Sequence, residues 1–166
     1  MSLTLQQLQV FCSTDETRTV LQVPFSDAFY TYATDRRIIV RVPLWPDVTA
    51  TGPNAAKVCE HIPADWTAIK LVKLPEPLPP IETEVCESCG GGEENKKGCD
   101  ECDGKGFTNK TTFYRLGNRC YQPFYLHKIA TLPDVVIAPD YGMYPQPLRF
   151  KFTGGVGLLM PMRVFE

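Results

Sequence analysis

The chain has 166 residues, of which 43% are hydrophobic and 22% charged, and its formal net charge is −2. This length supports one hydrophobic core with at most a small appended module, and the near-neutral charge excludes a global basic field that would attract nucleic acid or an anionic membrane. No apolar run approaches the roughly 20 residues of a membrane span, and the N-terminal MSLTLQQLQVF lacks a basic head and a cleavable apolar core. We therefore expect a soluble cytoplasmic protein with no membrane partner, in which any DNA contact is local.

The first predicted elements are a short helix and three strands. The helix is indicated by helical spacing of apolar residues within LTLQQLQVF (3–11), and Thr4 can cap its start. Segments rich in β-branched and aromatic residues then predict strands in TRTVLQVPF (17–25), AFYTYAT (28–34) and RRIIVRVP (36–43).

Prolines recur at short intervals after residue 43, which predicts an irregular segment. One helical turn is expected at 54–60. The run PEPLPP at 75–80 predicts a stiff, extended spacer that marks a boundary.

The last part of the chain predicts a strand, a helix and three more strands. TTFYRLGNRCYQ (111–122) reads as a strand with a turn at Gly117-Asn118, and QPFYLHKIATLP (122–133) as a short helix with Pro123 in its first turn. The three further strands are predicted in DVVIAPD (134–140), PLRFKFT (147–153) and VGLLMPMRVF (156–165). A helix followed by three strands thus occurs twice, and the only evidence for this repeat is the order of the predicted elements. The expected fold class is α+β with a mainly antiparallel sheet.

Four cysteines lie in the stretch CESCGGGEENKKGCDEC, residues 86–102. They form two Cys-x-x-Cys pairs, Cys86 with Cys89 and Cys99 with Cys102. One tight turn of this kind places two thiolates on the same ion, and two turns complete the tetrahedron that Zn²⁺ prefers. The odd total of seven cysteines favours a metal in a reducing compartment over disulfides. The sequence therefore predicts a zinc site with these four ligands.

This zinc site is predicted to be structural. A shell of four protein ligands leaves no position for water or substrate, so the ion would hold a segment too polar to fold by itself. A pair of redox dithiols and an iron site are the alternatives, but neither a βαβ pattern nor a further cysteine run supports them.

Charge argues against nucleic-acid binding by the cysteine segment. Between residues 82 and 110 there are eight acidic residues and four lysines. Four thiolates on one Zn²⁺ would add two further negative charges. Because affinity for a duplex comes mainly from neutralised phosphates, a protein partner is favoured over DNA for this segment.

The other chemically active side chains are predicted to be structural. Isolated cysteines in apolar segments are usually buried and unreactive. This applies to Cys12, Cys59 and Cys120. His61 lies in one short segment that cannot fill a metal shell, His127 is expected on the surface of the second helix, and Asp35 at a hairpin corner. No nucleophile triad, phosphate loop or paired carboxylates on a recognisable scaffold occur, so an enzyme is not expected.

Two segments resemble known families. CESCGGGEE and CDECDGKGF resemble the Cys-x-x-Cys-x-Gly-x-Gly units of the zinc domain in J-domain co-chaperones, although Glu93 replaces the later glycine of the first unit. GLLMPMRVFE (157–166), preceded by FYLHKIATLPDVVIAPD and PLRFKFTGG, resembles the C-terminal subdomain of bacterial sliding clamps, the β subunit of DNA polymerase III. YTYATDRRIIVRVP (30–43) is similar to the clamp strand pair around an Ala-Thr-Asp turn.

The clamp resemblance covers roughly 1–45 and 113–166. It implies a domain of two βαβββ units related by a pseudo-twofold axis, with the first strand of the first unit missing or cryptic in this chain. The expected division is a clamp-like domain of residues 1–81 and 113–166 with an inserted zinc-binding module at 82–112. A phage or mobile-element origin would fit such a small relative.

The clamp resemblance does not imply that this protein encircles DNA. A clamp ring needs several such domains, whereas this chain holds one, and its two predicted helices carry little positive charge. The basic residues lie instead in strands and turns, at Arg36, Arg37, Arg41, Arg115, Arg119, Arg149, Lys151 and Arg163. The expected function is a non-enzymatic zinc-binding accessory factor that binds protein, or DNA through these arginines. The alternative is a structural or regulatory scaffold whose zinc hairpin docks a protein partner, with no nucleic-acid role.

Overall fold

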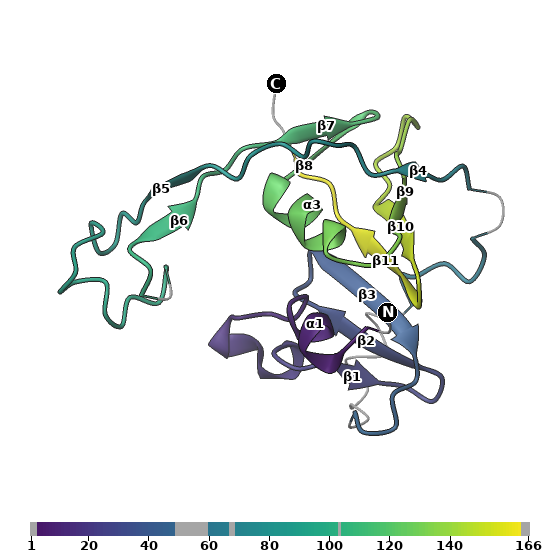
Figure 1. Ribbon diagram of the computed structural model, residues 1–166, viewed down its shortest axis with the longest axis horizontal. Coiled ribbons are helices and arrows are strands. Elements are labelled where there is room, and N and C mark those ends of the chain that lie inside the picture. Colours follow the sequence, from purple (N-terminus) through teal and green to yellow (C-terminus); the bar gives the residue numbers. More distant parts are fainter. Residues whose placement is uncertain (1–2, 49–59, 67–68, 103, 164–166) are drawn as a thin grey trace.

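The computed structural model describes residues 3–48, 60–66, 69–102 and 104–163. The fold is mixed α+β, and its main sheet has seven antiparallel strands in the order β1-β2-β3-β11-β10-β9-β4 (Figure 1). Two small two-stranded sheets, β5-β6 and β7-β8, lie outside it. This confirms the predicted α+β class with a mainly antiparallel sheet. No helix in the described part of the chain is both long and apolar enough to cross a membrane.

The first predicted helix is confirmed as α1 (Leu5–Gln9). Thr4 is its N-cap: the Thr4 hydroxyl accepts a hydrogen bond from the Gln7 N–H, and the Gln7 side chain accepts one from the Thr4 N–H. This reciprocal capping box satisfies two amides that have no partner within the helix. Leu8 is the buried residue of the helix.

The strand predicted at 17–25 is wrong over most of its length. Residues Glu16–Leu21 form the 3₁₀-helix η1, and only β1 (Phe25–Ser26) is extended and paired. Asp15 accepts hydrogen bonds from the Thr17 N–H at 2.9 Å and the Thr17 hydroxyl at 2.6 Å, which starts a tight turn. This local side-chain capping outweighs the β propensity of the threonines and valine that follow.

The next two predicted strands are confirmed as β2 (Tyr30–Thr34) and β3 (Ile38–Pro43), which pair as a hairpin. Asp35 forms the corner, where its carboxylate accepts hydrogen bonds from the backbone N–H groups of Arg37 and Ile38. Asp35 also accepts a 2.8 Å hydrogen bond from the Tyr125 hydroxyl, so this turn is tied to the second helix.

The predicted turn at Gly117-Asn118 joins β7 (Tyr114–Leu116) and β8 (Arg119–Tyr121) in a hairpin. A side chain at Gly117 would lie 2.4 Å from the Asp140 carbonyl oxygen, which explains the glycine. The second helix is confirmed as α3 (Pro123–Ala130), with proline in its first turn.

The three C-terminal strands are β9 (Val136–Ala138), β10 (Leu148–Phe152) and β11 (Gly155–Leu159). The last one ends earlier than the prediction of 156–165. Met160 is 53% exposed, and Pro161 has no N–H for a strand ladder. The Met162 N–H instead donates a 2.8 Å hydrogen bond to the Cys120 carbonyl, so the chain leaves the sheet and crosses to the β7-β8 hairpin.

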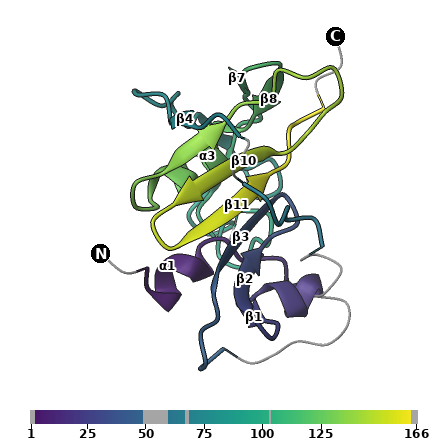
Figure 2. The same cartoon turned by 90° about the vertical axis from the view of Figure 1, so that its right-hand side faces the viewer.

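Strands β3 and β11 pair at the centre of the sheet and join two three-stranded meanders, β1-β2-β3 and β9-β10-β11 (Figure 2). A helix precedes each meander, α1 the first and α3 the second. The repeat predicted from element order is therefore also present in the sheet. The edge strand β4 (Val72–Lys73) pairs with β9, and β7-β8, which precedes α3, forms its own sheet.

The two faces of the sheet carry separate hydrophobic clusters. Both helices pack on one face, where the larger cluster includes Leu8, Phe11, Ile38, Val40, Leu126, Ile129, Ile137 and Phe150. The opposite face carries a smaller cluster that includes Leu21, Ile39, Trp66 and Leu158. Strand β3 thus supplies alternate residues to each cluster, as period-two alternation requires.

The proline spacer lies against α3. Between Leu74 and Glu82 the chain has no regular secondary structure, and Leu78 packs on the main core. His127 Nε2 lies 2.8 Å from the Pro79 carbonyl oxygen, so His127 is half-buried and holds the spacer rather than lying free on the surface. The turn predicted at 54–60 falls outside the described residues, except for Glu60.

Tyr121→Phe is expected to stabilise the protein. Tyr121 is fully buried, and its hydroxyl finds no hydrogen-bond partner among the described residues. Removing a buried, unsatisfied hydroxyl should raise the free energy of unfolding by about 1 kcal/mol. Urea unfolding followed by circular dichroism would measure this, and a clear loss of stability would show that the hydroxyl has a partner.

Asp140→Asn is expected to reduce the loss of stability in acid. Burial raises the pKa of Asp140, but N–H groups of Gly142 and Gln146 and the guanidinium of Arg119 outweigh it, so the net pKa is lowered. The carboxylate therefore adds stability above its unfolded pKa of about 3.9, and this is lost as the pH falls through the lower folded value. Between pH 6 and pH 2, the urea concentration at the midpoint of unfolding should fall less steeply with falling pH in the variant than in the unmodified protein. Equal slopes in the two proteins would contradict this.

Candidate metal centre

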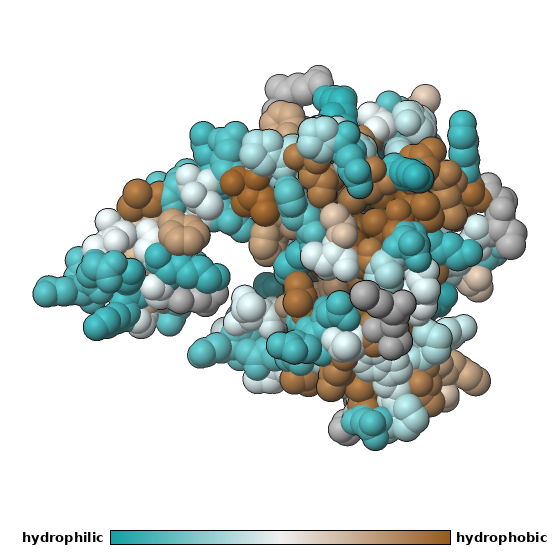
Figure 3. Space-filling view, viewed as in Figure 1, coloured by the Kyte–Doolittle hydropathy of each residue, from teal (hydrophilic) through white to brown (hydrophobic). Residues whose placement is uncertain are grey.

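The predicted cysteine segment forms an arm of residues 82–110, which we call the cysteine arm. Its base is a two-stranded ribbon of β5 (Thr83–Val85) and β6 (Phe107–Asn109), and the ribbon extends away from the main sheet to a compact tip (Figure 1). The described residues of the tip are mostly hydrophilic (Figure 3). Its buried cluster consists of cysteines alone, so apolar packing contributes little to its folding.

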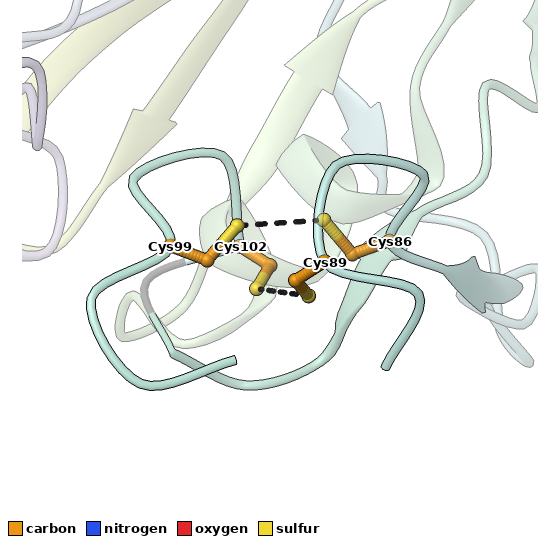
Figure 4. Close-up of side chains that lie close together, drawn as sticks. All are labelled: Cys86, Cys89, Cys99 and Cys102. Carbon is orange, nitrogen blue, oxygen red and sulfur yellow. Dashed lines mark hydrogen bonds between the residues drawn. The ribbon is translucent and has the colours of Figure 1, made fainter. Parts of the chain in front are cut away.

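The structure brings together the sulfur atoms of all four predicted ligands, Cys86, Cys89, Cys99 and Cys102. Their Sγ atoms all lie within 4.8 Å of one another, and both Cys86–Cys99 and Cys89–Cys102 are 3.7 Å apart (Figure 4). Sulfurs bound at 2.3 Å around a tetrahedral ion would be separated by about 3.8 Å. A disulfide needs about 2.05 Å, so the arrangement fits a shared ion rather than two bridges.

Two turns present the sulfurs from opposite sides. In the first, the Gly90 N–H donates to the Cys86 carbonyl at 2.8 Å, and in the second the Gly104 N–H donates to the Cys99 carbonyl at 3.2 Å. Both glycines have positive φ angles, 61° and 73°, which residues with a side chain rarely adopt. The glycines that follow the two Cys-x-x-Cys pairs are thus explained by the backbone conformation of the turns.

The two turns pack back to back through Gly91 and Gly106. A side chain on Gly91 would lie 3.0 Å from the Gly106 carbonyl oxygen, and one on Gly106 would lie 3.2 Å from that of Gly91. The Cys86 N–H also donates to the Gly106 carbonyl at 3.1 Å. This close approach joins residues that are far apart in the sequence and sets the distance between the two cysteine pairs.

Backbone hydrogen bonds and neighbouring sulfurs act on the thiols. Burial raises the pKa of Cys102, but the Gly106 N–H, which donates to its Sγ at 3.2 Å, and hydrogen bonds from the other thiols lower it to about 7. For Cys86 the Cys89 N–H lowers the pKa, yet burial and hydrogen bonds with Cys89 and Cys99 raise it to about 12. A bound divalent cation would displace the thiol protons and be held by the thiolates.

Sequence reasoning missed the polar bridge between the two turns. The Ser88 hydroxyl, in the first Cys-x-x-Cys pair, donates a hydrogen bond to the Glu101 carboxylate in the second. Lys96 and Glu93 form an ion pair at 2.6 Å, and Lys110 and Glu82 form another at 3.3 Å at the base of the ribbon. The spacing of these residues in the sequence gives no signal for the Ser88–Glu101 contact, because it depends on how the two turns face each other.

The remaining candidate residues stay apart from the four cysteines. Cys12 and Cys120 are buried in the body, as predicted, and burial raises the pKa of the Cys12 thiol to about 11. His61 is exposed, and Cys59 lies outside the described residues. Within the described part of the chain, only the four cysteines of the arm form a group that could hold a metal ion.

Comparison of the chain with protein-family models, with curated proteins and with solved structures finds no significant match. The function must therefore be argued from the arrangement of this chain's own residues.

Proposed function

We propose that this protein is a non-enzymatic, zinc-binding accessory factor that binds a protein or DNA partner. The observation that carries the proposal is the group of four sulfurs at the end of a projecting ribbon. Four cysteine ligands are typical of structural zinc sites, and they leave no open position for substrate. Zn²⁺ held by Cys86, Cys89, Cys99 and Cys102 would fix the shape of a tip that has almost no apolar core.

The body would serve as a clamp-like scaffold. In support of this, each of the two meanders follows a helix, and the meanders join antiparallel at β3 and β11. The predicted pseudo-twofold relation requires such an arrangement. Both helices also pack on the same face of the sheet.

The alternative is a scaffold whose cysteine arm docks a protein partner, with no role for nucleic acid. The charge of the tip favours this alternative for the arm itself, since acidic residues such as Glu87, Glu93 and Glu94 are exposed there. The ribbon also exposes Val85 (63%) and Phe107 (48%), which lie opposite each other in register. An apolar pair of this kind suits contact with another protein.

Metal content and oligomeric state, measured together by native mass spectrometry, test the proposal. We expect one Zn²⁺ per chain that is lost with a chelator. A ring-forming clamp relative would appear as a closed oligomer, whereas a scaffold would appear as a monomer that still carries zinc. A purified protein that binds no metal, or that contains iron instead, would overturn the zinc assignment. Retention on duplex DNA that weakens with increasing salt would favour the DNA-associated function over the protein-docking scaffold.

A further inference from the structure

Three surface grooves share lining residues. A groove of about 620 Å³ lies between the cysteine arm and the body, and a second groove, of about 380 Å³, shares Arg37 and Tyr125 with it. A third groove, of about 930 Å³, shares residues 160–163 with the second. The shared residues make one continuous path from the arm, past the β2-β3 turn, to the β7-β8 hairpin. We call it the basic path, for the reason given next.

The charge of the basic path is opposite to that of the chain as a whole. The described residues that line it include three acidic side chains, Asp15, Asp35 and Glu101. Asp15 is paired with Arg18, which also lines the path, at 3.0 Å. Asp35 and Glu101 accept hydrogen bonds from Tyr125 and Ser88. The other basic residues of the path are Arg37, Lys105, Arg115, Arg119, Lys128 and Arg163.

Three of these cations have no acidic partner among the residues that the structure describes. Arg37, Arg115 and Arg163 are exposed and form no ion pair with the described residues, whereas Arg119 is held by Asp140 at 3.0 Å. The three lie in the β2-β3 turn, in β7 and after β11, and thus come from sequence positions far apart. Only the tertiary structure places them along one path.

Aromatic side chains lie between the cations. Phe107 and Phe113 line the path and are 48% and 55% exposed. Phe124 lines the arm end of the path, where the Lys128 ammonium lies 4.6 Å from the centre of its ring. Phenyl rings and basic side chains that line the same groove are the two components with which proteins hold a single-stranded polynucleotide: the cations neutralise phosphates and the rings stack on bases.

We propose that the basic path binds single-stranded nucleic acid. A duplex fits less well, because its bases are stacked on one another and leave the phenyl rings no partner. An acidic peptide would match the charge, but it would not need cations distributed over all three grooves. The inference rests on the DNA-associated form of the proposed function and specifies its ligand. It rests mainly on the body, because six of the seven basic residues of the path and two of its three phenyl rings lie outside the cysteine arm.

Fluorescence anisotropy at 50 mM NaCl tests the proposal, with labelled dT20, rU20, a 20-base-pair duplex and a 20-residue Glu-rich peptide as probes. We expect dT20 or rU20 to bind at least tenfold more tightly than the duplex and the peptide. The double variant Arg37→Glu/Arg115→Glu should weaken this binding at least tenfold. It should also reduce the slope of log K against log salt by about 1.4, since each phosphate contact contributes about 0.7. Phe113→Ala should weaken it about tenfold without changing the slope.

The matched control is Lys73→Glu/Lys151→Glu, which makes the same change in charge at two exposed lysines of the sheet that do not line the path. Binding within twofold of the unmodified protein is expected. Equal losses in both double variants would mean that only net charge matters and would overturn the proposal. So would equal affinity for the duplex, absence of binding at 100 µM protein, or binding of the peptide alone. A failure of this kind would leave the metal measurements, and with them the zinc assignment, unaffected.

Discussion

Chelation of the metal, or Cys99→Ser, is expected to disorder the cysteine arm and leave the seven-stranded body folded. The buried cluster of the tip consists only of the cysteines, so without the ion almost no apolar area holds the two turns together. The body has its own clusters on both faces of the sheet, to which the tip adds nothing. Amide hydrogen exchange should show loss of protection at 82–110 and unchanged protection in β3, β10 and β11.

The matched control for this experiment is Cys12→Ala. Cys12 is a buried thiol of the main cluster that lies outside the group of four sulfurs. The change should lower the global free energy of unfolding by about 1 kcal/mol through a small cavity, while the arm keeps its metal and its protection. If chelation instead unfolded the whole chain, the arm would be part of the body's cooperative unit, and the division at 82–112 would be wrong.

Gly157→Val should destabilise the body strongly. Gly157 lies opposite Phe150 in the β10-β11 register, and the Phe150 ring covers it. A Cβ atom at this position would be 2.1 Å from Phe150 Cζ and 2.6 Å from the Ile39 carbonyl oxygen, which is backbone in the neighbouring strand. Because Phe150 is fully buried in the main cluster, it cannot move aside without opening the core. We expect a loss of about 3 kcal/mol or more in urea unfolding.

Gly92→Ala is the corresponding neutral glycine change, since the nearest atom to its added Cβ would be the side-chain nitrogen of Asn95 at 3.7 Å. The double variant Gly157→Ala/Phe150→Leu gives a sharper test. If the ring causes the clash, the double variant should lose less stability than the sum of the two single variants. Additive losses would place the cost of Gly157→Ala in the backbone contact with Ile39 instead.

Much of the body could be predicted because its elements are encoded locally. Thr4 with Gln7 caps α1, Pro123 starts α3, and the alternation in RRIIVRVP gives β3 one residue for each face. Predictions failed where a nearby polar group or a proline competed with β propensity. Asp15 turned residues 16–21 into a 3₁₀-helix, and Pro161 ended the last strand at Leu159.

Most helices and strands of the body, the mixed α+β class and the four candidate ligands could be read from the sequence, because capping, alternation and Cys-x-x-Cys spacing act over a few residues. The sequence did not indicate that β3 pairs with β11, that Gly91 packs on Gly106, or that Arg37, Arg115 and Arg163 line one path. These contacts join residues far apart in the chain. They are set by burying both faces of one sheet, a requirement on the whole molecule that no local pattern expresses.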